Sequence, residues 1–164
     1  MKTFTDTAGR TWDVQVNVDT IKRVRDLLSI NLLDIVEPDN DLVVRLAEDV
    51  ILVADCLFAV VKPQADEREV TDTDFGRALS GDVIDQATTA LLEELIDFFP
   101  KRRRAILRRA WETVKKVAAK LADQAEGRAR KALANPKLEK RLMARLSGGS
   151  AGPLPASSAS TPAD

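Results

Sequence analysis

The sequence predicts an α+β fold that is mainly α: a small N-terminal β-hairpin or sheet packed by four to five helices, plus a basic C-terminal helical extension. Two observations predict it. Apolar and polar residues alternate near the N-terminus, which is typical of strands, and apolar residues recur at intervals of three and four over most of the remaining chain, which is typical of amphipathic helices. With 164 residues, 45% of them hydrophobic, the chain is long enough for one domain with a core.

Residues 3–16 have the alternation of a hairpin, with a turn at 7–10 in which Gly9 takes the positive φ. The apolar positions of its strands are Phe4, Trp12, Val14 and Val16. A helix follows, with Asn17 or Asp19 as its N-cap. Residues 30–36 are apolar and β-branched enough for a third short strand, with an extension of the helix as the alternative.

Residues 41–62 predict two helices, one around 42–46 and a second over 49–61 that ends at Pro63. The charged stretch 64–70 is then predicted to be a loop. Next comes a short helix capped by residues 71–74, and a longer helix that stops at Phe99-Pro100. The apolar stripe of this longer helix is Ile84, Ala87, Leu91, Leu95 and Phe98.

Charge is divided sharply along the chain. Residues 1–100 hold nine Lys and Arg against 21 Asp and Glu, a net charge of −12, whereas residues 101–164 hold 16 against five, a net charge of +11. Such asymmetry indicates either an arm for nucleic acid or a membrane surface, or a basic segment that docks on an acidic surface of its own chain or of another.

The basic segment after Pro100 is amphipathic. Its apolar residues fall near a seven-residue repeat, which favours a partner helix on that side. The predicted partner-binding residues are Leu107, Trp111, Val114 and Leu121. The predicted contacts with phosphate or an acidic surface are Arg102, Arg103, Arg104, Arg108 and Arg109. Docking on protein is favoured over nucleic acid, because no recognition motif accompanies the charge and Trp111 is the segment's one aromatic for stacking.

These patterns divide the chain into three segments. They are an acidic globular domain over residues 1–100, a basic amphipathic helical extension over 101–146, and a disordered Pro-, Ser- and Ala-rich tail over 147–164. The extension ends in a short amphipathic helix that carries Leu138, Leu142, Met143 and Leu146.

Composition excludes several kinds of chemistry within this chain. It has no His, so a Ser-His-Asp triad, a His-ligated zinc or haem and an imidazole switch are excluded. A single cysteine, Cys56, excludes an intrachain disulfide, and its apolar neighbours predict an inert core thiol. For Trp12 and Trp111 we expect core packing rather than ligand binding.

Paired carboxylates are the remaining candidates for catalysis or metal binding. Asp72 and Asp74 fall where a helix N-terminus favours negative charge, and Glu93 and Glu94 fall on the polar side of a helix, so capping and solvation explain both pairs. A magnesium site from Asp72, Asp74 and Asp82 has no phosphate-binding glycine-rich loop beside it. We therefore predict no enzyme, and no catalytic, cofactor or metal site.

A set of short motifs runs through residues 1–100. They are Phe4-Thr5-Asp6 with Gly9-Arg10-Thr11-Trp12, Ile21-Lys22-Arg23-Val24-Arg25, Thr71-Asp72-Thr73-Asp74-Phe75 with Ser80-Gly81-Asp82, and Ala87 through Phe98-Phe99. Together they resemble the tail assembly chaperone-like proteins of phages and prophages. Members of that family are small cytoplasmic proteins that bind the tape measure protein, a very long helical chain, and keep it soluble until tail-tube subunits polymerise around it.

The resemblance implies reversible binding of a helical client, without turnover. In many phages these chaperones come as a short and a long product that share one N-terminal domain through a ribosomal frameshift, and the change of character after Pro100 resembles that extension. Two alternatives stay open: a nucleic-acid-associated accessory protein that uses the basic helix, and a structural virion subunit of the tail or connector. Self-association is a further expectation for the basic helix.

The sequence carries no signal that directs it to a membrane. Met1-Lys2 is followed by polar, turn-rich sequence in place of an apolar segment, and the longest apolar run, 50–61, is interrupted by Asp55 and too short to cross a bilayer. We therefore expect a cytoplasmic protein, in the host cell cytoplasm if it is phage-encoded, with no membrane partner.

Overall fold

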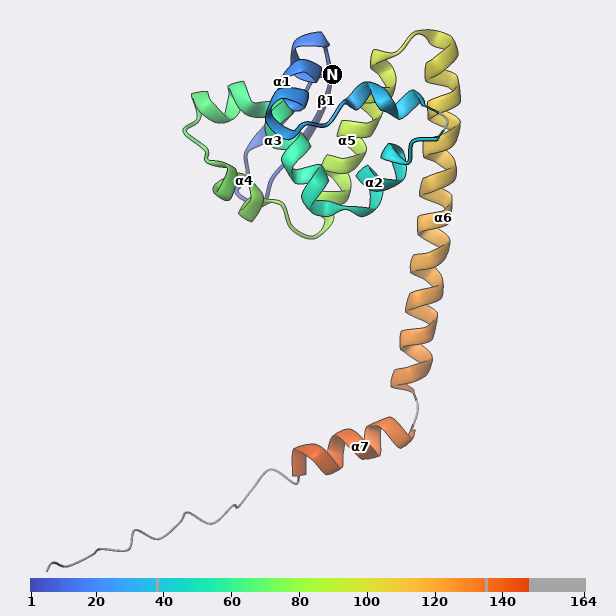
Figure 1. The fold of residues 1–164 in the computed structure, drawn as a ribbon. Coiled ribbons are helices and arrows are strands. Elements are labelled where there is room, and N and C mark those ends of the chain that lie inside the picture. The colour runs from blue at the N-terminus through green and yellow to red at the C-terminus, as the bar shows by residue number, and fades with distance from the viewer. Residues whose placement is uncertain (38, 135, 148–164) are drawn as a thin grey trace, which may run out of the picture. The chain divides into compact units, whose positions relative to one another are not determined.

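The computed structural model describes residues 1–37, 39–134 and 136–147. It is mainly helical with a small antiparallel sheet (Figure 1), which confirms the predicted fold class. Its elements are β1 (Lys2–Thr5), β2 (Thr11–Val14), α1 (Val18–Leu28), the 3₁₀ helix η1 (Leu32–Val36), α2 (Leu42–Glu48), α3 (Val50–Glu67), α4 (Asp72–Ala78), α5 (Asp82–Phe98), α6 (Lys101–Leu133) and α7 (Pro136–Ser147).

The hairpin of β1 and β2 is organised around one buried carboxylate, that of Asp6. It accepts hydrogen bonds from the backbone N–H groups of Ala8 at 3.0 Å and Arg10 at 2.9 Å, from Arg10 Nε at 2.7 Å and from Trp12 Nε1 at 2.9 Å. Gly9 completes the turn with a φ of 79°, as predicted. Burial alone would raise the pKa of Asp6, but the hydrogen bonds from Trp12 and Arg10 hold it below its ordinary value.

The predicted third strand is wrong, because residues 32–36 form η1. Asn31 accepts a hydrogen bond from the backbone N–H of Leu33 at 3.3 Å and so caps a turn where a strand would need extended backbone. Leu32 and Ile35, three residues apart, are buried, which is the period of a 3₁₀ helix.

Helices α2 and α3 are two helices, as predicted, and Asp49 separates them. Its backbone N–H donates to Arg45 at the end of α2, and its carboxylate accepts from the N–H groups of Ile51 and Leu52 at the start of α3. The predicted end of the second helix at Pro63 is wrong, because α3 continues to Glu67 and takes up most of the predicted loop.

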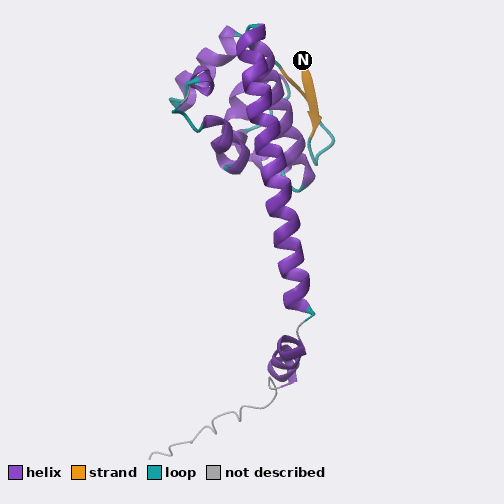
Figure 2. Cartoon of the chain, turned by 90° about the vertical axis from the view of Figure 1, so that its right-hand side faces the viewer, coloured by secondary structure: helices purple, strands orange, loops and turns teal. Residues whose placement is uncertain are grey.

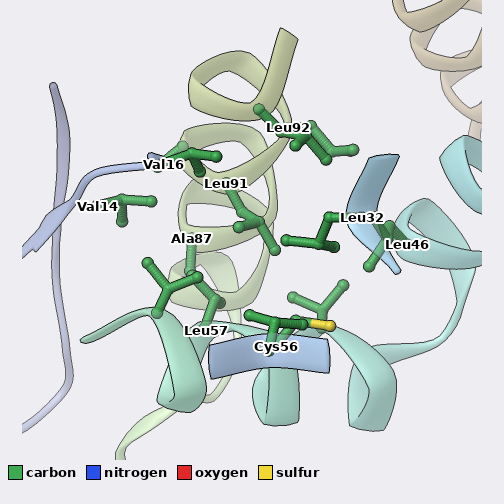
Figure 3. Close-up of a cluster of buried hydrophobic side chains, with 14 of the residues drawn as sticks. Val14, Val16, Leu32, Leu46, Cys56, Leu57, Ala87, Leu91 and Leu92 are labelled. Atoms are coloured by element: carbon green, nitrogen blue, oxygen red, sulfur yellow. The ribbon is translucent and has the colours of Figure 1, made fainter. Parts of the chain in front are cut away.

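A single core joins these elements. Figure 3 shows side chains from the hairpin, η1, α2, α3 and α5 meeting around Leu57 and Leu91, which are fully buried. Cys56 lies among them, and its burial raises the pKa of the thiol to about 12. Trp12 is also fully buried, so the predicted core roles of Trp12 and Cys56 are confirmed.

Helix α4 is capped at its acidic N-terminus by residues 71–74, as predicted. Thr71 Oγ1 accepts from the backbone N–H of Asp74 at 3.2 Å, and Asp72 and Asp74 both lie in the first turn. The hydroxyl of Thr71 also holds the pKa of Asp74 below its ordinary value. Both carboxylates thus lie where the helix dipole favours negative charge, and that of Asp74 accepts a hydrogen bond from the Thr71 hydroxyl.

The chain forms two compact units, Met1–Ala118 and a second that begins at Ala119. The boundary between them falls within α6. The predicted segment boundary after Pro100 coincides with the start of that helix. The predicted last helix is present as α7, and Gly127 lies inside α6. Of the predicted tail, Ser147 ends α7 and residues 148–164 lie outside the described residues.

Candidate functional site

The first turns of α6 are tied to the end of α5 by arginines. Arg104 donates from Nη2 to the backbone carbonyl of Asp97 at 2.9 Å and from Nε to that of Phe99 at 3.2 Å. Arg108 donates to the carboxylate of Asp97 at 2.7 Å. Cations at the carbonyl end of a helix are favourable because the helix dipole is negative there. Of the five predicted charge contacts, Arg108 therefore binds a carboxylate of the chain itself and Arg104 binds backbone carbonyls at the same helix end.

Helix α6 also inserts two side chains into the core of the first unit. Leu107 and Trp111 are each 5% exposed and belong to the buried cluster, and Val114 is half-buried against it. Trp111 Nε1 has no hydrogen-bond partner within the described part of the chain, and Lys115 Nζ lies 5.5 Å from the centre of its ring. These three predicted partner-binding residues thus contact the chain's own core.

A second apolar stripe on α6 is left uncovered by that core. Ile106 is 69% exposed and Val117 51% exposed, and Ala110 between them is also exposed. Because Ala110 and Val117 follow Ile106 by four and eleven residues, all three share one side of the helix. We call Ile106, Ala110 and Val117 the outer stripe.

The seven-residue repeat predicts a single apolar side for this helix, that of Leu107 and Val114, and it does not include Ile106. The spacing of four residues from Ile106 to Ala110 could have indicated a second apolar stripe, but the seven-residue spacing of Leu107 and Val114 indicates the first stripe alone. In the structure the inward and outward residues are neighbours around the helix, about 100° apart for Ile106 and Leu107. The single apolar side predicted for this helix is therefore two stripes, one buried against the core and one exposed to solvent.

Three arginines lie near the outer stripe and make no ion pair within the described residues: Arg102, Arg103 and Arg109. All three are exposed. Arg102 and Arg103 precede Ile106 by four and three residues and Arg109 follows it by three, so they are its neighbours on the helix surface. The face thus combines apolar side chains with uncompensated positive charge.

The second unit carries the fourth predicted partner-binding residue. Leu121 is 59% exposed, and Leu133, at the end of α6, is 72% exposed. Basic side chains again outnumber acidic ones here, because residues 119–133 hold Lys120, Arg128, Arg130 and Lys131 against Asp123 and Glu126. Of these, Arg130 is paired with Glu126 at 3.1 Å.

The other acidic candidates take part in structural contacts. The prediction that Glu94 is solvated is wrong, because it is 9% exposed and its carboxylate lies 3.1 Å from the amino nitrogen of Met1. Glu93 beside it pairs with Lys2 at 2.8 Å. The described residues contain no group of three or more Cys, Asp or Glu placed to hold a metal ion. In the same part of the chain, no helix combines the length and apolarity that crossing a membrane requires.

Comparisons with known proteins give the chain no relative. No protein-family model matches it, and neither the curated proteins nor the solved structures compared with it include a match.

Proposed function

We propose that this protein is a phage or prophage tail assembly chaperone that binds the helical tape measure protein through α6 and keeps it soluble during tail assembly. The observation that carries the proposal is the outer stripe of Ile106, Ala110 and Val117 beside Arg102, Arg103 and Arg109. An exposed apolar stripe on a helix fits the apolar face of a second helix.

The positive charges beside the outer stripe limit which client helices can bind there. Three arginines without ion pairs among the described residues attract carboxylates and repel a second basic helix. The expected client helix therefore has an apolar face edged by Asp or Glu. A long tape measure helix presents apolar faces repeatedly and would aggregate without cover. The resemblance of residues 1–100 to tail assembly chaperones supports the same client, and binding and release in the host cytoplasm need no active site.

An affinity experiment with matched variants tests the proposal. The tagged chain is used to capture proteins from its native host, with one half of each extract treated with nuclease, and the bound proteins are identified by mass spectrometry. We expect one very long helical protein in both halves. Ile106→Asp with Val117→Asp should abolish its capture, whereas Ile51→Asp, at a position 74% exposed on α3, should not.

The two alternatives predict different results. A nucleic-acid-associated protein would lose its bound material with nuclease and at moderate salt, and changing Arg102, Arg103 and Arg109 to Gln would weaken binding more than the aspartates do. A structural tail or connector subunit would be present in finished particles, from which a chaperone is absent. Either result would overturn the chaperone proposal.

A further inference from the structure

The start of α3 presents apolar side chains that the core does not cover. Val50 is 48% exposed and Ile51 is 74% exposed. Ala54, which is half-buried, follows Val50 by four residues and Ile51 by three, so the three side chains share one side of the helix. We call Val50, Ile51 and Ala54 the α3 face.

Negative charge lies beside the α3 face. Asp55 follows Ile51 by four residues and has no hydrogen bond or ion pair within the described part of the chain. Its partial burial and the negative charges of Asp72, on α4, and Asp49 raise its pKa, so the three carboxylates lie near one another. Arg45, four residues before Asp49, offsets one of these charges. The α3 face is thus apolar and edged by net negative charge.

The outer stripe on α6 has the same apolar composition and the opposite charge. Each of the two surfaces consists of one Ile, one Val and one Ala, and the outer stripe has arginines beside it where the α3 face has carboxylates. Both surfaces belong to the first unit and the large side chains of both are exposed, so neither covers the other within one chain. Figure 2 looks onto α6 and shows its first turns lying against the helical body, with one side of the helix turned to solvent.

We propose that the α3 face of one copy binds the outer stripe of a second copy and so covers the client face of that copy. The apolar side chains of the two helices pack together, while Asp49, Asp55 and Asp72 lie opposite arginines. The expected client helix has an apolar face edged by Asp or Glu, and the α3 face meets that description within this chain. Because the two surfaces differ, a copy bound at one of them keeps the other open and further copies can add.

The lengths of the two surfaces decide which partner prevails. The α3 face extends over a rise of four residues, about 6 Å of helix, whereas the outer stripe extends over a rise of eleven, about 16 Å. A second copy therefore covers part of the stripe, and a long client helix can cover all of it and displace the copy. This competition rests on the proposed function, whereas the contact between copies does not.

Sedimentation of the full chain tests the contact between copies. We expect the average mass to rise with protein concentration, and to rise less at moderate salt, which screens the attraction between carboxylates and arginines. A chain that stays monomeric at every concentration would overturn the contact.

Two variants, each with one damaged surface, locate the contact. Ile51→Lys damages the α3 face, and Ile106→Asp with Val117→Asp damages the outer stripe. In each variant alone we expect the apparent dissociation constant to rise roughly tenfold or more. Mixing the two should restore a 1:1 complex, because each keeps one intact surface. Val18→Lys, at a position 59% exposed on α1, is the matched control and should associate like the parent chain.

Two results with these variants would refute the arrangement. Undiminished self-association of Ile51→Lys would mean that the outer stripe binds something other than the α3 face. A mixture of the two variants that stays monomeric would mean that the two surfaces do not meet. Circular dichroism of each variant checks that its helices are intact.

A synthetic helix tests the competition. The probe is a fluorescent peptide of five helical turns with Leu along one side and Glu on both edges of that side, and its binding is measured by anisotropy. We expect it to bind the parent chain and reduce the sedimenting species to one chain per peptide, and to bind Ile51→Lys at least as tightly. Peptide binding that leaves the copies associated would overturn the competition.

The two proposals fail in different ways in these experiments. If the peptide does not bind while the two variants restore each other's association, the proposed client face is wrong and the contact between copies stands. If the peptide binds the outer stripe of a chain that never associates, the contact between copies is wrong and the client face stands.

Discussion

Arg23 on α1 donates from Nη1 to the backbone carbonyl of Ala59 on α3, 3.2 Å away. Ala59 lies four residues before Pro63, and in an uninterrupted helix its carbonyl would accept the N–H that proline lacks. The same nitrogen lies 3.2 Å from the carbonyl of Val60. An arginine of one helix thus supplies the donor that a proline removes from another, which explains how α3 continues to Glu67.

Replacement of Arg23 should destabilise the fold through this carbonyl. We expect Arg23→Met to lower the free energy of unfolding by about 1–3 kcal/mol, since a charged hydrogen bond is lost and its acceptor is left inside the protein. Urea unfolding followed by circular dichroism measures the change. Asp19→Asn, which removes the carboxylate partner of Arg23, controls for the ion pair.

Pro63→Ala provides the second arm of a double-mutant cycle. An alanine at this position restores the N–H, so Arg23→Met should cost clearly less in the Pro63→Ala background than in the parent chain. An equal loss in both backgrounds would show that Arg23 acts through contacts other than the carbonyl of Ala59.

The carboxylate of Asp6 should make stability depend on acid pH. Because its pKa is lower in the folded chain than in the unfolded chain, its contribution is complete above the unfolded pKa and is lost as pH falls through the folded pKa. Asp6→Asn should therefore be less stable by roughly 2 kcal/mol near neutral pH and should flatten the fall in stability below about pH 4. Urea unfolding at a series of pH values measures both effects. An unchanged pH slope in Asp6→Asn would assign the acid sensitivity to other groups.

Neighbouring positions on α6 should differ sharply in their tolerance of truncation. Leu107→Ala removes a side chain from the core and should lower the free energy of unfolding by about 2–4 kcal/mol. Ile106→Ala, at a position 69% exposed, should change it by less than about 0.5 kcal/mol. Thermal and urea unfolding of the two variants provide the comparison, and similar losses would mean that α6 does not insert Leu107 as described.

The thiol of Cys56 should be unreactive in the folded chain. It is fully buried and its pKa is raised to about 12, so both access and the thiolate fraction are low. Labelling with a thiol reagent at pH 8 should be slow without denaturant and should accelerate at the urea midpoint of unfolding. Fast labelling in the absence of urea would indicate local opening of α3.

The spacing of apolar residues along the sequence predicted the helices and strands that bury one face against the core. The strands of the hairpin, the cap of α1 at Asn17 and the stripe of α5 all followed from local pattern, because each depends on side chains close in sequence. The departures came from contacts between distant segments. The continuation of α3 past Pro63 depends on Arg23, 40 positions earlier in the sequence, and the burial of Glu94 depends on the strand β1 beside it.

The candidate sites were predictable to a smaller degree. The basic amphipathic character of α6 was evident, but a heptad pattern does not say which of two adjacent stripes the core covers. Leu107 and Trp111 are covered because they join the buried cluster of the first unit, which is a property of the assembled unit. The contacts of Gln64 and Arg68 with the outer edge of β2 have no signature in the hairpin, since both side chains come from α3, more than 50 positions later in the sequence.

The two tryptophans give the first unit a pair of built-in optical reporters. The chain has two Trp and no Tyr, so its ultraviolet emission comes from Trp12 in the hairpin and Trp111 on α6. Their surroundings differ, because the indole of Trp12 is bonded to Asp6 and lies under the guanidinium of Arg68 at 4.8 Å, whereas Trp111 lies under the ammonium of Lys115. Single-tryptophan versions of the chain would therefore follow the release of α6 and the opening of the hairpin as separate fluorescence transitions.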